Sequence, residues 1–150
     1  EQAEQMLEKS FYGELCREAL NKGSICHGEY NQHNVRILKN EAGVTGFSHW
    51  CFGIQAGDLY RFMRKIMEKY NWNQELSEEM LKAYCEISAL SKEEKEYLKI
   101  RFSYPDKFWK ISNYYYTHNK AWISEKNTEK LKMLIRQREK WDRFCKECFR

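Results

Sequence analysis

The sequence is poor in the residues that interrupt helices. It has one proline, Pro105, and seven glycines among 150 residues. A sandwich or barrel of many short strands needs more turn residues than this, so the composition favours long helices. No apolar run approaches the about 20 residues that a helix needs to cross a membrane. The sequence therefore predicts a mainly α-helical protein without a transmembrane segment.

Cysteine is present but shows no disulfide framework. The six cysteines are scattered without a recurring spacing, so free thiols are expected. Cys145 and Cys148 have the CxxC spacing of metal and redox sites, but a structural zinc site usually needs a second pair of ligands. On a helix the two residues are near neighbours and also suit an apolar core. We expect core packing and keep a metal or redox role as the alternative.

The chain has enough apolar material for a core, and its positive charge is unevenly spread. Hydrophobic residues make up 42% of the sequence, which excludes disorder for want of apolar side chains. One domain over residues 1–150 is expected at this length. Residues 126–150 hold nine Lys or Arg against four Asp or Glu, although the whole chain carries only +4. Such a helix could bind nucleic acid, an anionic membrane or an acidic partner, but its interspersed acids favour a solvated face.

Apolar residues recur with the 3.6-residue period of an amphipathic helix along most of the chain. Gly23 is typical of a helix end, and Pro105 suits a first helical turn. Ser91 and Glu94 have the spacing of a capping box at a helix start. The predicted helices cover residues 2–22, 59–70, 74–87, 91–102, 105–115 and 128–149.

Two short alternating stretches interrupt the helical pattern. Residues 35–38 and 44–47 alternate apolar and small or polar side chains, and residues 39–43 between them have turn composition. This arrangement predicts one small β-hairpin. The expected fold is therefore mainly α with a single hairpin.

The segment before this hairpin carries the most informative motif. It reads Ile25-Cys26-His27-Gly28-Glu29-Tyr30-Asn31-Gln32-His33-Asn34. It resembles the catalytic loop of the aminoglycoside phosphotransferase and choline kinase superfamily, whose pattern is H-G-D-x-x-x-x-N. His27, Gly28 and Asn34 are in register with the pattern, and Glu29 stands in the place of the Asp. After the hairpin, Gly46-Phe47 takes the place of the family's metal-binding Asp-Phe pair.

Short blocks further along the chain are similar to the CotS-type kinase-like spore coat proteins. The resemblance covers nearly the whole chain and implies the helical C-terminal lobe of a protein-kinase-like fold. It also implies a cytoplasmic protein, with the spore coat as a further location. The blocks are Phe52-Gly53, Asp58-Leu59-Tyr60-Arg61-Phe62, Asn71-Trp72, Tyr104-Pro105-Asp106-Lys107-Phe108-Trp109 and Asn119-Lys120-Ala121-Trp122.

The resemblance also assigns roles to individual residues. Glu29 would hold the position of the catalytic base, and His27 would shape the loop. Asn34 and the residue at position 46 would hold the metal ions on the nucleotide phosphates. Asp58 would brace the loop, although its place before an expected helix also suits an N-cap.

Three departures from the pattern argue against a working kinase. Glu29 is one methylene longer than Asp, and a shift of about 1 Å can cost about 100-fold in rate. Gly46 has no side chain and so lacks the metal-binding carboxylate, and magnesium prefers hard oxygen ligands. The 26 residues before the motif hold no glycine-rich loop or strand Lys. With Glu1 rather than Met first, we expect an excised piece whose N-terminal lobe is absent.

Three functions are compatible with these features. The favoured one is a degenerate kinase-like (pseudokinase) domain that acts as a structural or interaction module without a cofactor. A protein partner or a homodimer would then cover the surface that normally faces the N-terminal lobe. The second is an active small-molecule phosphotransferase that uses Mg-ATP, with Glu29 as base and Asn34 as metal ligand. The third is a nucleic-acid binder built on residues 126–150, which we rank last.

Overall fold

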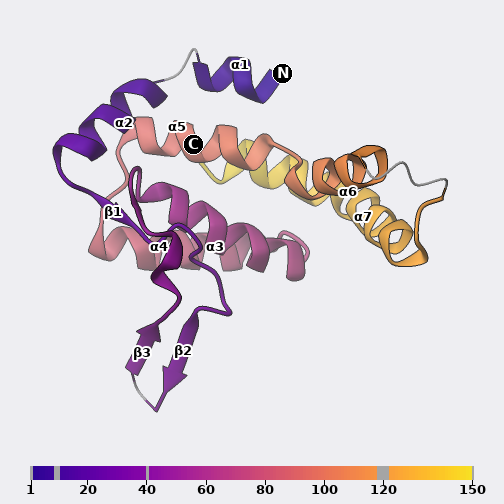
Figure 1. Ribbon diagram of the computed structural model, residues 1–150, viewed down its shortest axis with the longest axis horizontal. Coiled ribbons are helices and arrows are strands. Elements are labelled where there is room, and N and C mark those ends of the chain that lie inside the picture. Colours follow the sequence, from indigo (N-terminus) through magenta and orange to yellow (C-terminus); the bar gives the residue numbers. More distant parts are fainter. Residues whose placement is uncertain (1, 9–10, 40, 118–121, 150) are drawn as a thin grey trace.

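The computed structural model describes residues 2–8, 11–39, 41–117 and 122–149. Over these ranges the chain forms seven α-helices, four short strands and one 3₁₀ turn (Figure 1). The predicted mainly helical fold is confirmed. The helices are α1 (Gln2–Glu8), α2 (Tyr12–Asn21), α3 (Ala56–Lys69), α4 (Gln74–Ile87), α5 (Lys92–Ser103), α6 (Asp106–Thr117) and α7 (Glu125–Glu147).

Local capping explains several of the helix boundaries. At the start of α5 the Ser91 hydroxyl accepts a hydrogen bond from Glu94 N at 3.1 Å, and the Glu94 carboxylate accepts one from Ser91 N at 2.9 Å. The predicted capping box is therefore present. Beyond the end of α2, Gly23 adopts a φ of +63°. Ser24 N then donates to Ala19 O and Gly23 N to Leu20 O, the pattern of a Schellman motif.

Five of the six predicted helices have different bounds in the structure, by up to three residues at an end, and α3 begins at Ala56 rather than at residue 59. Residues 2–22 form two helices rather than one, and both α1 and α2 pack against α5. Helix α7 begins at Glu125 rather than at residue 128, because the Ser124 side chain caps it by accepting from Asn127 N at 3.4 Å. Thr128 already lies inside this helix.

The core lies between α3, α4, α5 and the end of α7. Its centre is Phe102, which is 1% exposed. The Phe102 ring meets Tyr60 and Phe144 edge-on, with centroids 4.9 and 5.0 Å away, and stacks on Phe149. Ile135 of α7 is 74% exposed although the helical period of residues 128–149 predicts an apolar face there. The side-chain amide of Gln137 is buried against α3 instead.

The strands form two sheets rather than one hairpin. The predicted hairpin pairs β2 (Val35–Leu38) with β3 (Glu41–Val44), and Leu38 opposes Glu41. Its second strand therefore lies three residues earlier than residues 44–47, because the connection is tight and Lys39 adopts a φ of +57°. Sequence analysis missed the second sheet, in which β1 (Ile25–Cys26) pairs with β4 (Cys51–Phe52).

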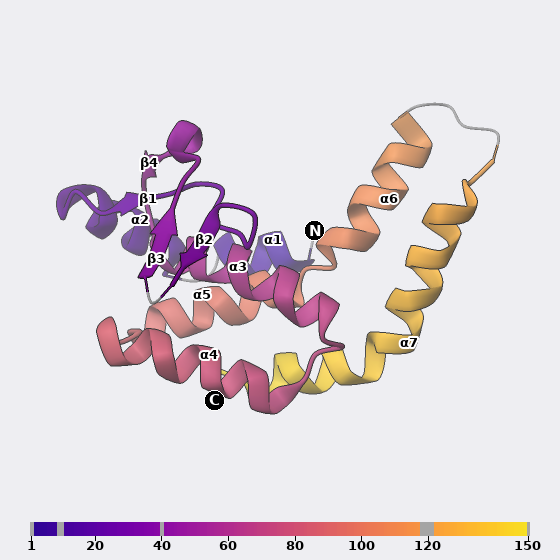
Figure 2. The same cartoon turned by 90° about the horizontal axis from the view of Figure 1, so that it is seen from below.

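The strands and the α6–α7 pair lie toward opposite ends of the molecule (Figures 1 and 2). Helix α3 runs between these two regions and contributes residues to both. Within the described ranges no helix is long and apolar enough to cross a membrane.

Candidate functional site

The loop that carries the motif leaves β1 and turns over the first turn of α3. The Asp58 carboxylate holds this turn by accepting a hydrogen bond from His27 N at 2.5 Å through Oδ2. Its Oδ1 accepts a second bond from Gly28 N at 3.1 Å. Hydrogen bonds from backbone N–H groups to a carboxylate are stronger than those between neutral groups. Asp58 therefore fixes the backbone at the start of the loop.

The helix-cap interpretation of Asp58 is wrong. Helix α3 begins two residues earlier, at Ala56, and its cap residue Gln55 makes no capping hydrogen bond through its side chain. Asp58 lies inside the first turn, where a negative charge also favours the positive end of the helix dipole. Its carboxylate is directed to the loop rather than to the N–H groups of its own helix.

His27 is buried at 7% exposure, and both of its ring nitrogens have partners. Nε2 lies 2.9 Å from Thr45 O, a group that can only accept. Nδ1 accepts from Glu29 N at 3.1 Å. The two contacts match the neutral imidazole with its proton on Nε2. His27 thus ties the loop to the segment after the hairpin, while the role predicted from the resemblance stays a prediction.

Gly28 sits where no other residue fits easily. Its φ is +82°, and a Cβ at this position would lie 1.9 Å from the backbone oxygen of His49. The loop and the 3₁₀ turn at Phe47–His49 therefore pack backbone to backbone. This close approach places His49 beside the motif, a contact that nothing in the sequence pattern indicated.

The Glu29 carboxylate, at the base position, faces solvent. Its side chain is 52% exposed, and Oε1 lies 3.8 Å from Nε2 of His49, whose side chain is 63% exposed. The Glu29 backbone oxygen has a structural role instead, because it accepts from Asn31 Nδ2 at 2.8 Å and from Asn34 Nδ2 at 2.9 Å. Among the residues that the structure describes, none forms a short hydrogen bond with the side chain that would orient it for proton transfer.

Asn34 and Gly46, the two positions expected to bind metal, lie next to each other. A Cβ at position 46 would be 2.9 Å from Asn34 Oδ1, and Gly46 has a φ of +83°. Thr45 N also donates to Asn34 O at 2.9 Å, which brings the two segments together. The two segments are therefore adjacent as the resemblance implies, and position 46 offers no side chain, while the metal role of both positions stays a prediction.

The remaining donors do not fit a magnesium pair. Asn34 Nδ2 is engaged with Glu29 O, which leaves Oδ1 as the one side-chain oxygen at this position. Magnesium in nucleotide sites is usually bound through one or two carboxylates and phosphate oxygens. Among the described residues no cluster of three or more His, Cys, Asp or Glu could hold a metal ion.

Aromatic contacts stabilise the loop from the side of α3. Tyr30 stacks on Phe62 of α3 with the ring centroids 5.0 Å apart, and Phe47 packs on the His27 ring at 4.6 Å. Sequence analysis did not single out Tyr30 or Phe62 as neighbours. The one signal for the pair was the predicted helix over residues 59–70, which includes Phe62.

The CxxC thiols on α7 lie in the core rather than in an open site. Cys145 Sγ contacts Phe102 O at 3.5 Å, and Cys148 Sγ contacts Ser77 Oγ at 3.7 Å. Burial raises the pKa of Cys145 to about 12 and that of Cys148 to about 11. Reactive cysteines have depressed pKa values, so the core interpretation fits this geometry better than the metal or redox alternative.

Comparison with known proteins agrees with the loop motif. Residues 1–148 match the family described as "Spore coat putative kinase YutH". The chain belongs to this family. This match confirms the resemblance to kinase-like spore coat proteins. The family that it names is the YutH type, whereas the short blocks suggested the CotS type. No curated protein matches the chain.

A solved structure supports the fold of this YutH-family chain. An aminoglycoside phosphotransferase from Alicyclobacillus acidocaldarius subsp. acidocaldarius DSM 446 superposes with a TM-score of 0.87 at 17% sequence identity. The match covers 98% of this chain and 44% of that one. The chain thus has the fold of part of an aminoglycoside phosphotransferase and spans less than half of its length.

Proposed function

We propose that this YutH-family chain is a kinase-like module of the spore coat that does not transfer phosphate and acts through contacts with other proteins. The observation that carries the proposal is Gly46. Its backbone lies beside Asn34 Oδ1, where a metal-binding carboxylate would be needed, and it offers no side chain. The loop keeps its shape without this ligand, because Asp58 and His27 hold it through the backbone.

The chemistry of phosphoryl transfer makes this loss decisive. The reaction depends on positioning and on metal ions that neutralise the charge developing on the phosphate. Asn34 supplies one neutral oxygen, and the nearby Glu29 carboxylate is solvent-exposed. A neutral amide binds a hard divalent cation less strongly than a carboxylate does. The site is therefore expected to bind Mg-ATP poorly.

The face beside the loop suits contact with protein. Several large apolar side chains on β1, β2, the 3₁₀ turn, β4 and the residue between these last two are more than half exposed. Single exposed apolar residues are ordinary, but a group of them marks an interaction surface. The loop-side face, as we name it, consists of Ile25, Ile37, Leu38, Phe47, Trp50 and Phe52. A protein partner or a second copy of the chain would cover it.

A substitution on this face tests the contact. Trp50 is 54% exposed and meets Phe52 edge-on at 5.8 Å, outside the main core. Trp50→Ser in the full-length protein should reduce its incorporation into the spore coat several-fold while leaving its unfolding midpoint almost unchanged. Incorporation is measured by quantitative immunoblotting of coat extracts from sporulating cells.

Trp109→Ser on α6 provides the matched control. Trp109 is 49% exposed and lies on a helix at the other end of the molecule. It should leave incorporation at the wild-type level. Equal incorporation of both variants and the wild type would count against the loop-side face.

Release of ADP by residues 1–150 tests the phosphotransfer part of the proposal. The wild-type chain should show no magnesium-dependent ATP turnover above background. Gly46→Asp should show none either, because the chain has no glycine-rich loop or strand Lys to anchor the phosphates. Gly46→Ala carries the same backbone strain without the carboxylate and serves as control. Turnover by Gly46→Asp alone would contradict this account.

Two other functions have weaker support. The retained His27, Asn34 and Asp58 contacts keep a working phosphotransferase as the second candidate, with Glu29 as its base. A nucleic-acid role for α7 is not supported by a continuous basic face, because Lys132 pairs with Glu129 at 2.8 Å and Arg138 with Asp142 at 3.9 Å.

A further inference from the structure

A cavity of about 370 Å³ lies between α3, α6 and α7. Its volume falls in the range of small-molecule sites, roughly 300–1,000 Å³. It is separate from the loop, because Asp58 and Glu68 stand ten residues apart on α3, about 15 Å along the helix axis. Most of its wall is apolar and comes from Trp72, Phe102, Pro105, Phe108, Leu134 and Trp141.

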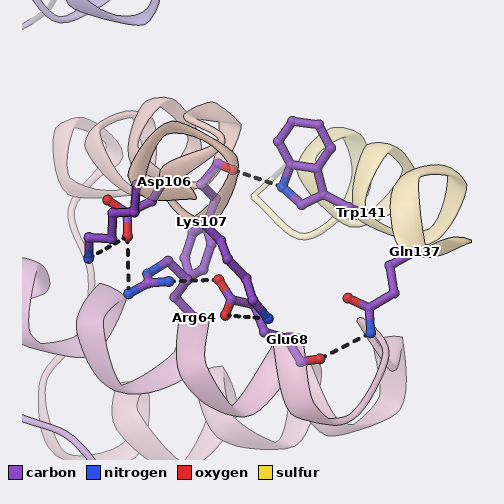
Figure 3. Close-up of polar contacts among 8 residues, drawn as sticks. Arg64, Glu68, Asp106, Lys107, Gln137 and Trp141 are labelled. Atoms are coloured by element: carbon purple, nitrogen blue, oxygen red, sulfur yellow. Dashed lines mark hydrogen bonds and ion pairs between the residues drawn. The ribbon is translucent and has the colours of Figure 1, made fainter. Parts of the chain in front are cut away.

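Four of the five charged side chains that line the cavity are paired with one another, whereas the fifth, Arg138, is 77% exposed and lies 3.9 Å from Asp142 outside the lining. Arg64 Nη1 lies 2.6 Å from Glu68 Oε1, and Arg64 Nη2 lies 3.2 Å from Asp106 Oδ2 (Figure 3). Lys107 Nζ lies 3.6 Å from Glu68 Oε2. All four side chains are less than a quarter exposed. A charged ligand would have to compete with one of these pairs, so the cavity favours an uncharged molecule.

Gln137 offers a hydrogen-bond acceptor that is not in use. Its side chain reaches from α7 toward α3, and Nε2 donates to the backbone oxygen of Glu68 at 3.1 Å. That contact fixes the amide orientation, since a carbonyl can only accept. Gln137 is 7% exposed, and its Oε1 is buried with no hydrogen-bond partner among the residues that the structure describes. Buried polar atoms are normally satisfied, so an unpaired acceptor on a side chain that lines the cavity needs a partner that the described residues do not supply.

A fixed aromatic wall completes the site. Trp141 Nε1 donates to Phe102 O at 3.0 Å, which holds the indole in one orientation at the edge of the cavity. Trp72 is 8% exposed and packs on Phe144 with the ring centroids 5.1 Å apart. Two indoles held in this way form a preformed surface for an apolar ring or chain.

We propose that this cavity binds an uncharged, largely apolar small molecule that donates one hydroxyl or N–H hydrogen bond to Gln137 Oε1. The site goes beyond the proposed function, since it requires neither ATP nor a metal and is separate from the loop-side face. It would make the module responsive to a small molecule as well as to protein contacts.

The test uses two probes, 2-naphthol, which has a hydroxyl donor, and 2-methoxynaphthalene, in which a methyl group replaces the hydroxyl hydrogen. Both are titrated into the ¹⁵N-labelled full-length protein, and the side-chain indole N–H signals are followed by NMR after assignment with single Trp→Phe variants. Trp72 and Trp141 should shift, whereas Trp50 and Trp122, which lie outside the cavity lining, should not. The Kd of 2-naphthol should be about fivefold lower, the effect of one hydrogen bond.

Variants then locate the acceptor. Gln137→Leu should abolish the difference between the two probes. Gln74→Leu, the same change at an exposed position on α4, should preserve it. The comparison of probes in the wild type stands even if Gln137→Leu fails to fold. Absence of shifts at Trp72 and Trp141, or equal affinity of the wild type for both probes because water occupies Gln137 Oε1, would overturn the proposal.

Discussion

Individual glycines determine how the loop is built. Gly23, Gly28 and Gly46 all have a positive φ, but the space around each differs. A Cβ at Gly23 would meet nothing within 4 Å, one at Gly46 would meet the movable side chain of Asn34, and one at Gly28 would meet backbone. Substitution of Gly23 therefore measures backbone strain alone, whereas substitution of Gly46 or Gly28 adds a steric clash.

The first prediction concerns alanine substitutions at these glycines. Gly23→Ala should lower the free energy of unfolding by about 1 kcal/mol, the cost of left-handed backbone with a Cβ. Gly46→Ala should cost slightly more, and Gly28→Ala roughly 3 kcal/mol or more, because the His49 backbone must move. Urea denaturation of the three variants measures the order. A Gly28→Ala variant as stable as Gly23→Ala would contradict the packing of the loop on the 3₁₀ turn.

At the scale of the element, the C-terminal end of α7 buries two thiols. Cys145 in the helix and Cys148 directly after it face the core. Burial raises their pKa values from 9.0 to about 12 and about 11. Below pH 9 the two thiols are protonated in both the folded and the unfolded chain, and their burial does not lower the free energy of unfolding. As the pH rises above 9 the unfolded chain loses these protons first, so stability falls toward the folded-state pKa values.

The second prediction concerns the fall of the free energy of unfolding at high pH. Between pH 7 and pH 10 the wild type should lose on the order of 1 kcal/mol per thiol, after discounting for partial exposure. A Cys145→Ala, Cys148→Ala double variant should lack that part of the loss, while other titrating groups contribute equally to both proteins. Urea denaturation at the two pH values in reducing buffer gives the comparison. Equal losses would show that these thiols do not titrate from a buried state.

Elements with strong local signals were the ones that the sequence predicted best. Helix α4 has the predicted bounds, 74–87, because periodicity coincides with a cap in which Asn73 Oδ1 accepts from Leu76 N at 2.8 Å. The two-residue strands β1 and β4 carry no period and form only through long-range pairing. The second hairpin strand was misplaced because turn composition extended beyond the actual turn.

In the candidate site, too, local features could be predicted from the sequence and long-range contacts could not. The loop motif and the missing carboxylate at Gly46 could be identified from short sequence patterns. The contacts of His27 with Thr45 O and of Gly28 with His49 could not, because they join segments that meet only in the folded chain. Gln137 gave no signal at all, since a polar residue within a basic helix is expected to face solvent.

At the scale of the whole molecule, a phosphotransferase-like fold coexists with a glycine at the position where the resemblance implies a metal-binding carboxylate. The superposition on a solved aminoglycoside phosphotransferase covers 98% of this chain. The position beside Asn34 nevertheless lacks its carboxylate. Fold alone does not determine activity. Whether the chain can transfer phosphate therefore depends on whether this site binds Mg-ATP.

Thermal unfolding of the full-length protein with ATP, in the presence and absence of magnesium, tests this claim most directly. A ligand that binds only the folded state raises the unfolding midpoint. We predict the same midpoint with ATP alone and with Mg-ATP, in the wild type and in Gly46→Ala. A magnesium-dependent rise in the wild-type midpoint would contradict the account and would favour an active phosphotransferase.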